Sequence, residues 1–243
     1  NIFSSDEATV ELGVGKNMVK SIRFWLLACK MVKYSNSKYE PTELGSLIFD
    51  AKGGVDPYLE DEVTLWLIHW LISTNPKNAT AWFWFFNRFH KPEFMADESS
   101  AALIEFANQN NIKSSLTILK GDTGILLRMY SRSTGNTRTS LEEALDSPLS
   151  LLGLITQAPG GRNYFSYPEE REDLPLCVFG FAVLQLLETL EKKDLPIGDL
   201  MYSKTDFPSL GAVFRLTENS LISKLEQLGQ IYGDIFGCLF LVK

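Results

Sequence analysis

The sequence contains few of the side chains that bind transition metals or serve as nucleophile and base in hydrolases. Its histidines are His69 and His90, and its three cysteines are Cys29, Cys177 and Cys238. These residues lack the close spacings of zinc modules, and no nucleophile-elbow sequence is present. We therefore expect neither a zinc site nor a Ser-His-Asp triad. Three widely separated cysteines in apolar surroundings are typical of buried thiols in a reducing compartment, which predicts a cytoplasmic protein.

Long apolar runs are also missing. The longest, residues 174–187, is too short to cross a bilayer, and no signal peptide is visible, so no membrane span is expected. The composition is nevertheless 45% hydrophobic and 12% aromatic, enough to bury a substantial core. A length of 243 residues allows one large domain or two to three small ones.

Carboxylates are absent between Glu11 and Glu40, although the chain as a whole has a formal net charge of −7. This window carries six cations: Lys16, Lys20, Arg23, Lys30, Lys33 and Lys38. On a helix over residues 16–31, the first four would share one face and the apolar side chains would occupy the other. Such a face is typical of a solvated amphipathic helix, but charge of a single sign favours contact with phosphates.

Residues 1–50 predict a winged helix-turn-helix. A short helix ends at Gly13, the basic helix follows, two extended segments flank Asn36 and Ser37, and Thr42 caps a third helix. The string from Gly13 to Lys16 is similar to a phosphate-binding loop. Val10 stands in place of the first glycine of that motif, however, and Asn17 in place of its Ser or Thr, so a nucleotide site is not expected.

The remaining chain predicts a mainly α protein with short β-hairpins, of the α+β class. Residues 51–140 indicate an aromatic helical core with a buried hairpin over 58–73 and 79–89 and a second helix-turn-helix-like segment. Residues 141–243 indicate a C-terminal α+β module with further winged-helix-like parts, a helix over 176–190, and strands over 209–215 and 237–242. His69 falls within the apolar helix and is expected to be a hydrogen-bonded core residue.

Acidic side chains cluster at Asp56, Glu60 and Asp61, where the helix over 58–73 begins. Carboxylates on one helix face are suitable ligands and catalytic groups for Mg²⁺-dependent phosphodiester cleavage. Acids at a helix start also stabilise the helix dipole, which leaves a purely structural role open. The possible third contributors to a metal site are Asp122, Glu142, Glu143 and Asp146.

Several strings resemble the SspB-like family of DNA phosphorothioation (SspABCD) anti-phage systems. They are Leu12-Gly-Val-Gly-Lys-Asn-Met-Val19, Asp56-Pro-Tyr-Leu-Glu-Asp-Glu62 and Leu145-Asp-Ser-Pro-Leu149. The resemblance covers nearly the whole chain. It implies a Mg²⁺-dependent DNA nicking endonuclease that works with a cysteine desulfurase, an ATPase and a PAPS-reductase-like protein. It also implies a further segment upstream of Asn1 that contributes to the site.

Three hypotheses follow. In the first, Lys16, Asn17, Lys20, Arg23, Lys30, Arg128, Arg132 and Arg138 bind DNA, and a subset of the three clustered acids binds Mg²⁺ for nicking. In the second, the protein is a non-catalytic winged-helix module that recognises DNA and recruits modification enzymes. In the third, the tryptophan-rich hairpin contacts a protein partner, which would require a large exposed aromatic patch.

Overall fold

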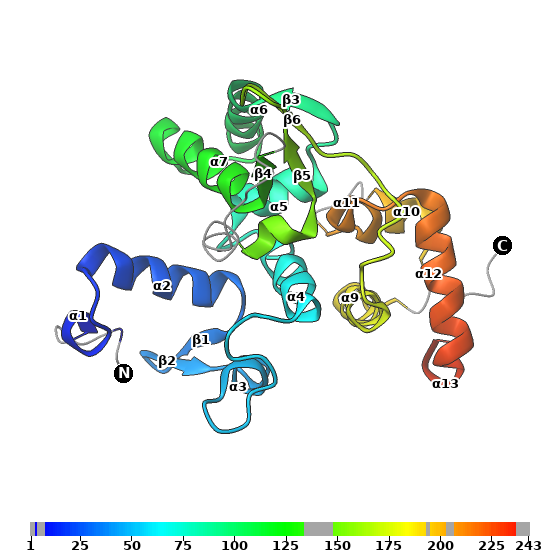
Figure 1. The fold of residues 1–243 in the computed structure, drawn as a ribbon, viewed down its shortest axis with the longest axis horizontal. Helices are drawn as coiled ribbons and strands as arrows, with labels where there is room; N and C mark the ends of the chain where they lie inside the picture. The colour runs from blue at the N-terminus through cyan, green and yellow to red at the C-terminus, as the bar shows by residue number, and fades with distance from the viewer. Residues whose placement is uncertain (1–2, 4–7, 134–147, 193–194, 203–206, 237–243) are drawn as a thin grey trace.

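The N-terminal segment, residues 8–50, has the predicted order of elements. The computed structural model of the chain describes residues 3, 8–133, 148–192, 195–202 and 207–236. In this segment it contains α1 (Ala8–Glu11), α2 (Lys16–Ala28), the antiparallel strands β1 (Val32–Ser35) and β2 (Lys38–Pro41), and α3 (Glu43–Phe49). Figure 1 shows α2 above the β1–β2 hairpin, with α1 at its outer end. The order agrees with the prediction, and the winged-helix assignment stays a prediction.

Local chemistry explains the hairpin and the start of α3. Asn36 and Ser37 have positive φ angles of 50° and 60°, the backbone that a two-residue hairpin turn requires. The Thr42 hydroxyl accepts a hydrogen bond from the backbone N–H of Gly45 over 3.0 Å, which caps α3 as predicted. A Cβ atom at Gly45 would lie 2.1 Å from the carbonyl oxygen of Met31. The close approach of α3 to the chain before β1 therefore requires glycine.

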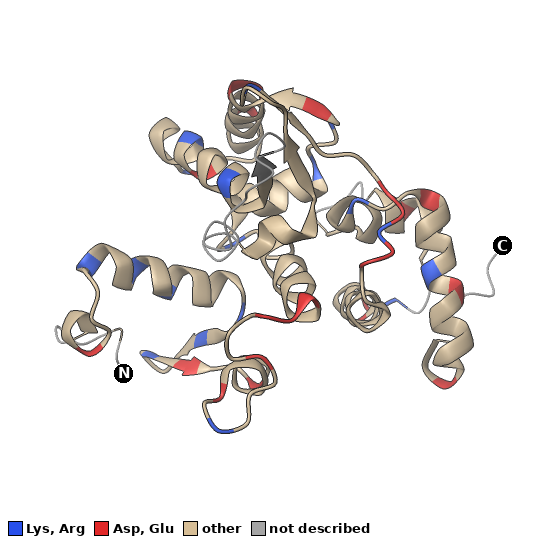
Figure 2. Cartoon of the chain, in the orientation of Figure 1, with Lys and Arg blue, Asp and Glu red and all other residues tan. Residues whose placement is uncertain are grey.

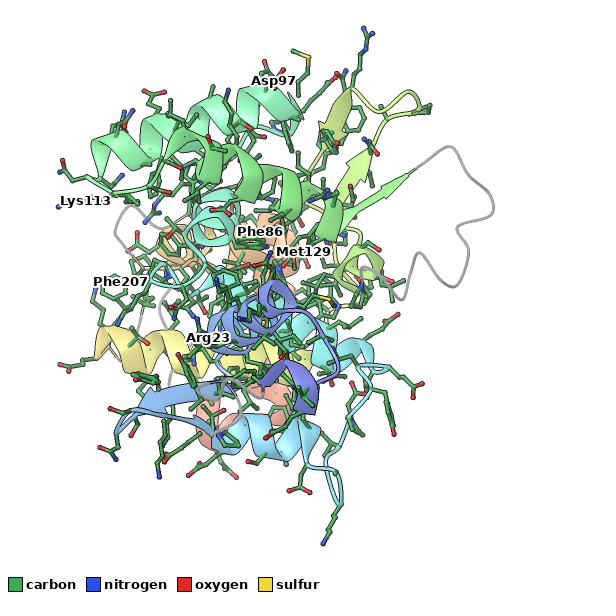
Figure 3. The ribbon with its side chains drawn as sticks, turned by 90° about the vertical axis from the view of Figure 1, so that its left-hand side faces the viewer. Arg23, Phe86, Asp97, Lys113, Met129 and Phe207 are labelled. Atoms are coloured by element: carbon green, nitrogen blue, oxygen red, sulfur yellow. The ribbon has the colours of Figure 1, made fainter. Side chains whose placement is uncertain are left out.

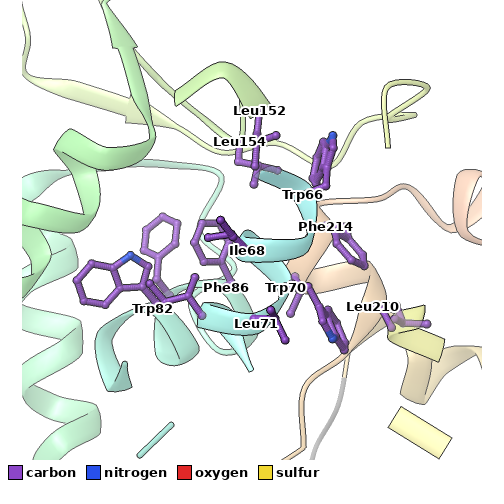
Figure 4. Packing of buried hydrophobic residues seen from close by; sticks show 14 of the residues in the cluster. Trp66, Ile68, Trp70, Leu71, Trp82, Phe86, Leu152, Leu154, Leu210 and Phe214 are labelled. Carbon is purple, nitrogen blue, oxygen red and sulfur yellow. The ribbon is translucent and has the colours of Figure 1, made fainter. Parts of the chain in front are cut away.

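The core is built around α4 (Glu62–Ser73) and α5 (Thr80–Asn87), as the aromatic pattern predicted. Figure 4 shows Trp66 and Trp70 of α4 directed toward Phe214, and the Trp70 and Phe214 rings stack at 5.3 Å. Most of the aromatic side chains of α4 and α5 are less than 5% exposed. The tryptophan-rich hairpin is therefore part of the core, and its described residues offer no large aromatic patch to a partner.

Next along the chain, α6 (Ala96–Gln109) and α7 (Leu116–Tyr130) pack against each other. The backbone N–H of Met95 donates to the Glu98 carboxylate over 2.8 Å and marks the start of α6. The helix α7 runs through Gly121 without a break. Burial of Leu119, Leu126 and Leu127 compensates the cost of a glycine in the helix, about 1 kcal/mol.

A four-stranded sheet lies beside α6 and α7 and was not predicted as such. Its order is β3-β6-β5-β4, with β4 and β5 parallel and the other pairs antiparallel. The 3₁₀ helix η2 (Pro148–Leu152) leads into this sheet. The strands are β3 (Glu93–Met95), β4 (Ser131–Ser133), β5 (Ile155–Gln157) and β6 (Asn163–Phe165). Each has three residues, too few to show the alternation that identifies a strand.

The C-terminal part is helical: α9 (Leu176–Leu190), α10 (Ile197–Met201), α11 (Leu210–Phe214), α12 (Glu218–Ile231) and α13 (Gly233–Phe236). The prediction for α9 is confirmed. The predicted strand over 209–215 is wrong, because this segment forms α11 and ends at Arg215 with a left-handed φ of 52°. All of residues 209–216 are buried, so their sequence carries no periodic pattern. The predicted strand over 237–242 lies outside the described residues.

The N-terminal segment is joined to the core by side chains as well as by the linker. The amide Nδ2 of Asn75, just after α4, donates to the backbone oxygen of Ala28 over 2.9 Å and to that of Leu27 over 3.3 Å. The ring of Trp25 meets that of Trp82 edge-on at 5.1 Å. Buried side chains of both parts form one apolar cluster. The predicted boundaries at residues 50 and 140 stay predictions.

The cysteines only partly match expectation. Cys29 is half-buried, whereas Cys177 is exposed on α9, so the prediction of buried thiols is wrong for Cys177. Cys238 lies outside the described residues. Within the described part of the chain, no helix has the length and apolarity needed to cross a membrane.

Candidate nucleic-acid interface and acidic loop

The first half of α2 presents three of the predicted DNA-binding residues to solvent. Lys16, Asn17 and Lys20 are all exposed. The helix begins after Gly15, which offers no side-chain acceptor to the first N–H groups. A helix N-terminus carries a positive partial charge, so this end of α2 attracts anions, and the two lysines add to the attraction.

Arg23 connects α2 to the β1–β2 hairpin. Its guanidinium carbon lies 5.7 Å from the centre of the Tyr39 ring on β2, and the Tyr39 ring contacts that of Tyr34 at 4.7 Å. A guanidinium over an aromatic face is held by electrostatic attraction to the ring. Arg23 is half-buried in this arrangement and links the helix to the hairpin.

The hairpin adds two exposed lysines, Lys33 on β1 and Lys38 on β2. Both lie between Glu11 and Glu40, where the sequence has no carboxylate, but they were not among the predicted DNA contacts. Their position in this stretch could have identified them, because the predicted turn at Asn36 and Ser37 places both lysines on the same hairpin as the basic helix. Figure 2 shows Lys and Arg residues along α2 and on the hairpin.

Lys30 is placed differently. It follows α2 with a positive φ of 59°, and its ammonium Nζ lies 3.5 Å from the hydroxyl oxygen of Thr74 at the end of α4. Burial lowers the pKa of Lys30 below its ordinary value. Lys16 and Lys30 are also separated by about 20 Å along the helix axis. The structure therefore brings Lys16, Asn17, Lys20 and Arg23 together and directs Lys30 toward the core.

The three arginines predicted to bind DNA, Arg128, Arg132 and Arg138, lie only partly within the described residues. Arg128 is exposed in the last turn of α7, Arg132 belongs to β4, and Arg138 lies outside the described residues. In Figure 3, which looks onto this side of the molecule, the labelled side chain of Arg23 lies below that of Met129 on α7.

The buried side chain of Asp56 stabilises the loop over residues 56–61, which contains the three clustered acids. It is 6% exposed, and its carboxylate accepts the backbone N–H of Glu60 over 2.8 Å and that of Asp61 over 3.2 Å. Burial acts to raise the pKa of Asp56. Hydrogen bonds from the Thr64 side chain and from the backbone of the loop outweigh burial, and the pKa lies below its ordinary value. This ionised carboxylate closes the loop before α4.

The other two predicted acids, Glu60 and Asp61, are exposed. Oδ1 of Asp61 accepts the backbone N–H of Val63 over 2.8 Å and caps α4. The described residues contain no cluster of three or more His, Cys, Asp or Glu side chains that could hold a metal ion. Both oxygens of Asp56 accept backbone N–H groups and the side chain is buried, so Asp56 is the least accessible of the three predicted acids.

The further acids considered for a metal site lie elsewhere. Asp122 is half-buried on α7, and burial raises its pKa. Glu142, Glu143 and Asp146 lie outside the described residues. Of the predicted acids, Glu60 and Asp61 are the exposed ones at the start of α4.

His69 is the core histidine that the sequence predicted. Its Nε2 lies 2.9 Å from the backbone oxygen of Val213, and its Nδ1 lies 2.9 Å from the Tyr130 hydroxyl. A carbonyl can only accept, so Nε2 carries the proton and Nδ1 accepts from Tyr130. Burial lowers the pKa of His69 to about 3, and the side chain is neutral at physiological pH. It holds α4 to α7 and α11 and is remote from solvent.

Comparison with known proteins places this architecture. A crystal structure of SspB superposes with a TM-score of 0.78 at 25% sequence identity, covering 96% of this chain and 71% of that chain. A magnesium ion-bound crystal structure of SspB gives a TM-score of 0.77 at 24% identity, covering 95% and 70%. No curated protein sequence matches the chain.

The mainly helical α+β architecture is thus an SspB-like fold, and the resemblance predicted from the sequence strings is confirmed. Residues 1–237 match the family described as protein of unknown function DUF4007, and the chain belongs to this family.

Proposed function

We propose that this protein is a DNA-binding component of a DNA phosphorothioation system and that α2 with the β1–β2 hairpin forms its DNA surface. The observation that supports this proposal is the group of exposed lysines, Lys16, Lys20, Lys33 and Lys38, on a surface whose one acid within these elements is Glu40, opposite Lys33 on the hairpin. Ion pairs among the described residues join Lys91 to Glu98 and Arg171 to Glu169, so none of them uses these four lysines. An excess of exposed cations at this density favours a phosphate backbone.

The same surface supports a helix-turn-helix mode of binding. The second helix of such a motif enters the major groove with its N-terminal residues leading. In this protein that helix is α2, and Asn17 would meet base edges while Lys16 and Lys20 contact phosphates. The hairpin would serve as the wing, with Lys33 and Lys38 along an adjacent backbone.

DNA binding is tested by a double charge reversal, Lys16→Glu/Lys20→Glu, measured by titration of duplex DNA at several salt concentrations. We expect at least tenfold weaker binding, with a decrease of about one in the salt-dependence exponent per lost phosphate contact. The matched control is Lys77→Glu/Lys192→Glu, which reverses two exposed lysines outside this surface. Equal effects of the two pairs would contradict the proposal.

Mg²⁺-dependent nicking of DNA is the activity that the family resemblance supports, and one of the two SspB structures binds a magnesium ion. Glu60 and Asp61 would hold Mg²⁺ together with a DNA phosphate, since Mg²⁺ often binds one or two carboxylates plus substrate phosphate. The metal would stabilise the charge that develops on the phosphate. Cysteine desulfurase, ATPase and PAPS-reductase-like subunits would then act on the opened strand.

Nicking is tested by relaxation of supercoiled plasmid in Mg²⁺. The variant Glu60→Gln/Asp61→Asn removes both charges but keeps a side chain that can cap α4, so the fold is preserved. We expect at least tenfold slower nicking with DNA affinity unchanged. The control, Glu43→Gln/Asp50→Asn, alters two exposed acids, one at the start of α3 and one just after its end. Undiminished nicking would assign both acids to capping, and DNA binding without any strand break would favour the recruitment role.

A further inference from the structure

The C-terminal half of α2 forms one wall of an apolar cavity of about 440 Å³. The opposite walls come from α3, α4, α7 and η2, so the cavity lies where the N-terminal segment meets the core. Trp25 and Cys29 belong to the wall from α2, and Ile72, Ile125 and Leu149 belong to the walls from the core. On α2 these side chains lie across the helix from Lys16 and Lys20.

The chemistry of the lining is uniform. None of the described residues that line the cavity carries a charge. Burial raises the pKa of the Cys29 thiol to about 12, so this group is also uncharged at physiological pH. Several lining residues, among them Trp25, Cys29, Ile125 and Met129, are only half-buried, which leaves the cavity reachable from solvent. Water gains few hydrogen bonds in such a space.

Size and chemistry together define the occupant. Enclosed apolar cavities of about 150 Å³ already bind benzene or xenon. Pockets for small-molecule ligands typically measure about 300–1,000 Å³. From this geometry we infer that the cavity between α2 and the core is a binding site for one uncharged, largely apolar small molecule. The site is separate from the proposed DNA surface and does not depend on it.

The site is tested with the neutral fluorescent probe N-phenyl-1-naphthylamine on the full chain. We expect saturable binding of one probe per protein and at least tenfold weaker binding of the anionic analogue 1-anilinonaphthalene-8-sulfonate, because the lining offers no cation. Ile125→Trp fills the cavity from α7 and should abolish binding. Ile118→Trp, an exposed position on the same helix, is the matched control and should bind normally. Absence of saturable binding, or equal binding by both variants, would overturn the inference.

A second measurement needs no variant and therefore no assumption about folding. Alkylation by N-ethylmaleimide is followed separately at each cysteine by peptide mass spectrometry, with and without the neutral probe. Cys29 lines the cavity, whereas Cys177 is exposed on α9. The probe should slow alkylation of Cys29 at least fivefold and leave Cys177 unaffected. An unchanged rate at Cys29 under saturating probe would contradict occupancy of the cavity.

Discussion

Arg215 and Phe85 are joined by a hydrogen bond from the guanidinium Nη2 to the backbone oxygen, 3.0 Å long, which ties the end of α11 to the last turn of α5. The same guanidinium donates to the backbone oxygen of Phe89 over 3.1 Å and to the Ser166 hydroxyl over 2.9 Å. Burial lowers the pKa of Arg215 to about 10, so it remains charged at neutral pH. A cation buried among the carbonyls at a helix C-terminus is stabilised by the helix dipole.

Replacement of Arg215 by Met should destabilise the fold by about 3 kcal/mol or more, because several buried carbonyls lose their donor and each unsatisfied group costs about 1–3 kcal/mol. Arg215→Lys should lose less, since an ammonium still reaches some of these oxygens. Urea unfolding measures both, with Arg162→Met at an exposed turn as control. A loss below about 1 kcal/mol for Arg215→Met would show that the carbonyls find other partners.

The neutral His69 makes stability depend on pH. Its folded-state pKa of about 3 lies below the ordinary value of 6.5, so the unfolded chain binds more protons between these values. Stability should therefore fall as pH decreases from about 6 toward 3, by up to about 1.4 kcal/mol per pH unit from this residue. His69→Gln keeps one donor and one acceptor and should flatten this slope. Denaturant midpoints across the range test it, and an identical slope in the variant would contradict the assignment.

Asp56 should matter for stability more than for chemistry. Asp56→Asn leaves one acceptor oxygen for the N–H groups of Glu60 and Asp61, and we expect a loss of about 1 kcal/mol. Because the folded-state pKa of Asp56 is lowered, its contribution is present at neutral pH and is lost as pH falls through that pKa. Thermal unfolding at pH 7 provides the measurement. Glu62→Gln, an exposed first-turn change on α4, is the control and should cost at most a few tenths of a kcal/mol.

Gly45 offers a test of the hairpin arrangement. Gly45→Ala would force a methyl group against the carbonyl of Met31 and should destabilise the protein by about 2 kcal/mol or more, with weaker DNA binding as α3 and the hairpin separate. Gly53→Ala is the natural comparison, because no atom lies within 4 Å of a Cβ at that position. Calorimetry and DNA titration on both variants distinguish them. Equal stability of the two would mean that α3 moves without cost.

The sequence predicted the parts of this fold whose patterns are local. The basic α2, the turn at Asn36 and Ser37, the Thr42 cap and the α4–α5 hairpin all follow from charge, turn chemistry or aromatic density within a short window. The helix α11 was missed because every side of it is buried. The three-residue strands β3, β4 and β5 were missed because so short a segment shows no alternation and becomes a strand only by pairing with its neighbours.

In the candidate site, too, local sequence patterns predicted some features, whereas others depend on tertiary contacts. The exposure of Lys16 and Lys20 follows from helical periodicity. The contact of Lys30 with Thr74 depends on the left-handed backbone conformation of Lys30 itself, which no sequence pattern predicted. The acids at the start of α4 illustrate the limit most clearly. Their spacing suits either metal binding or helix capping, and the hydrogen bonds of Asp56 and Asp61 to backbone N–H groups appear only in three dimensions.

The hydrogen bonds from Asn75 to the last carbonyls of α2 should hold the N-terminal segment to the core even if the chain is cut between them. The exposed residues between α3 and α4, around Gly53, are the kind of loop that proteases cut. A cut there would sever the covalent connection, but the amide of Asn75 and the edge-on contact of Trp25 with Trp82 would still hold the two pieces against each other. Fragments produced separately from either side of this loop should accordingly find each other and reassemble.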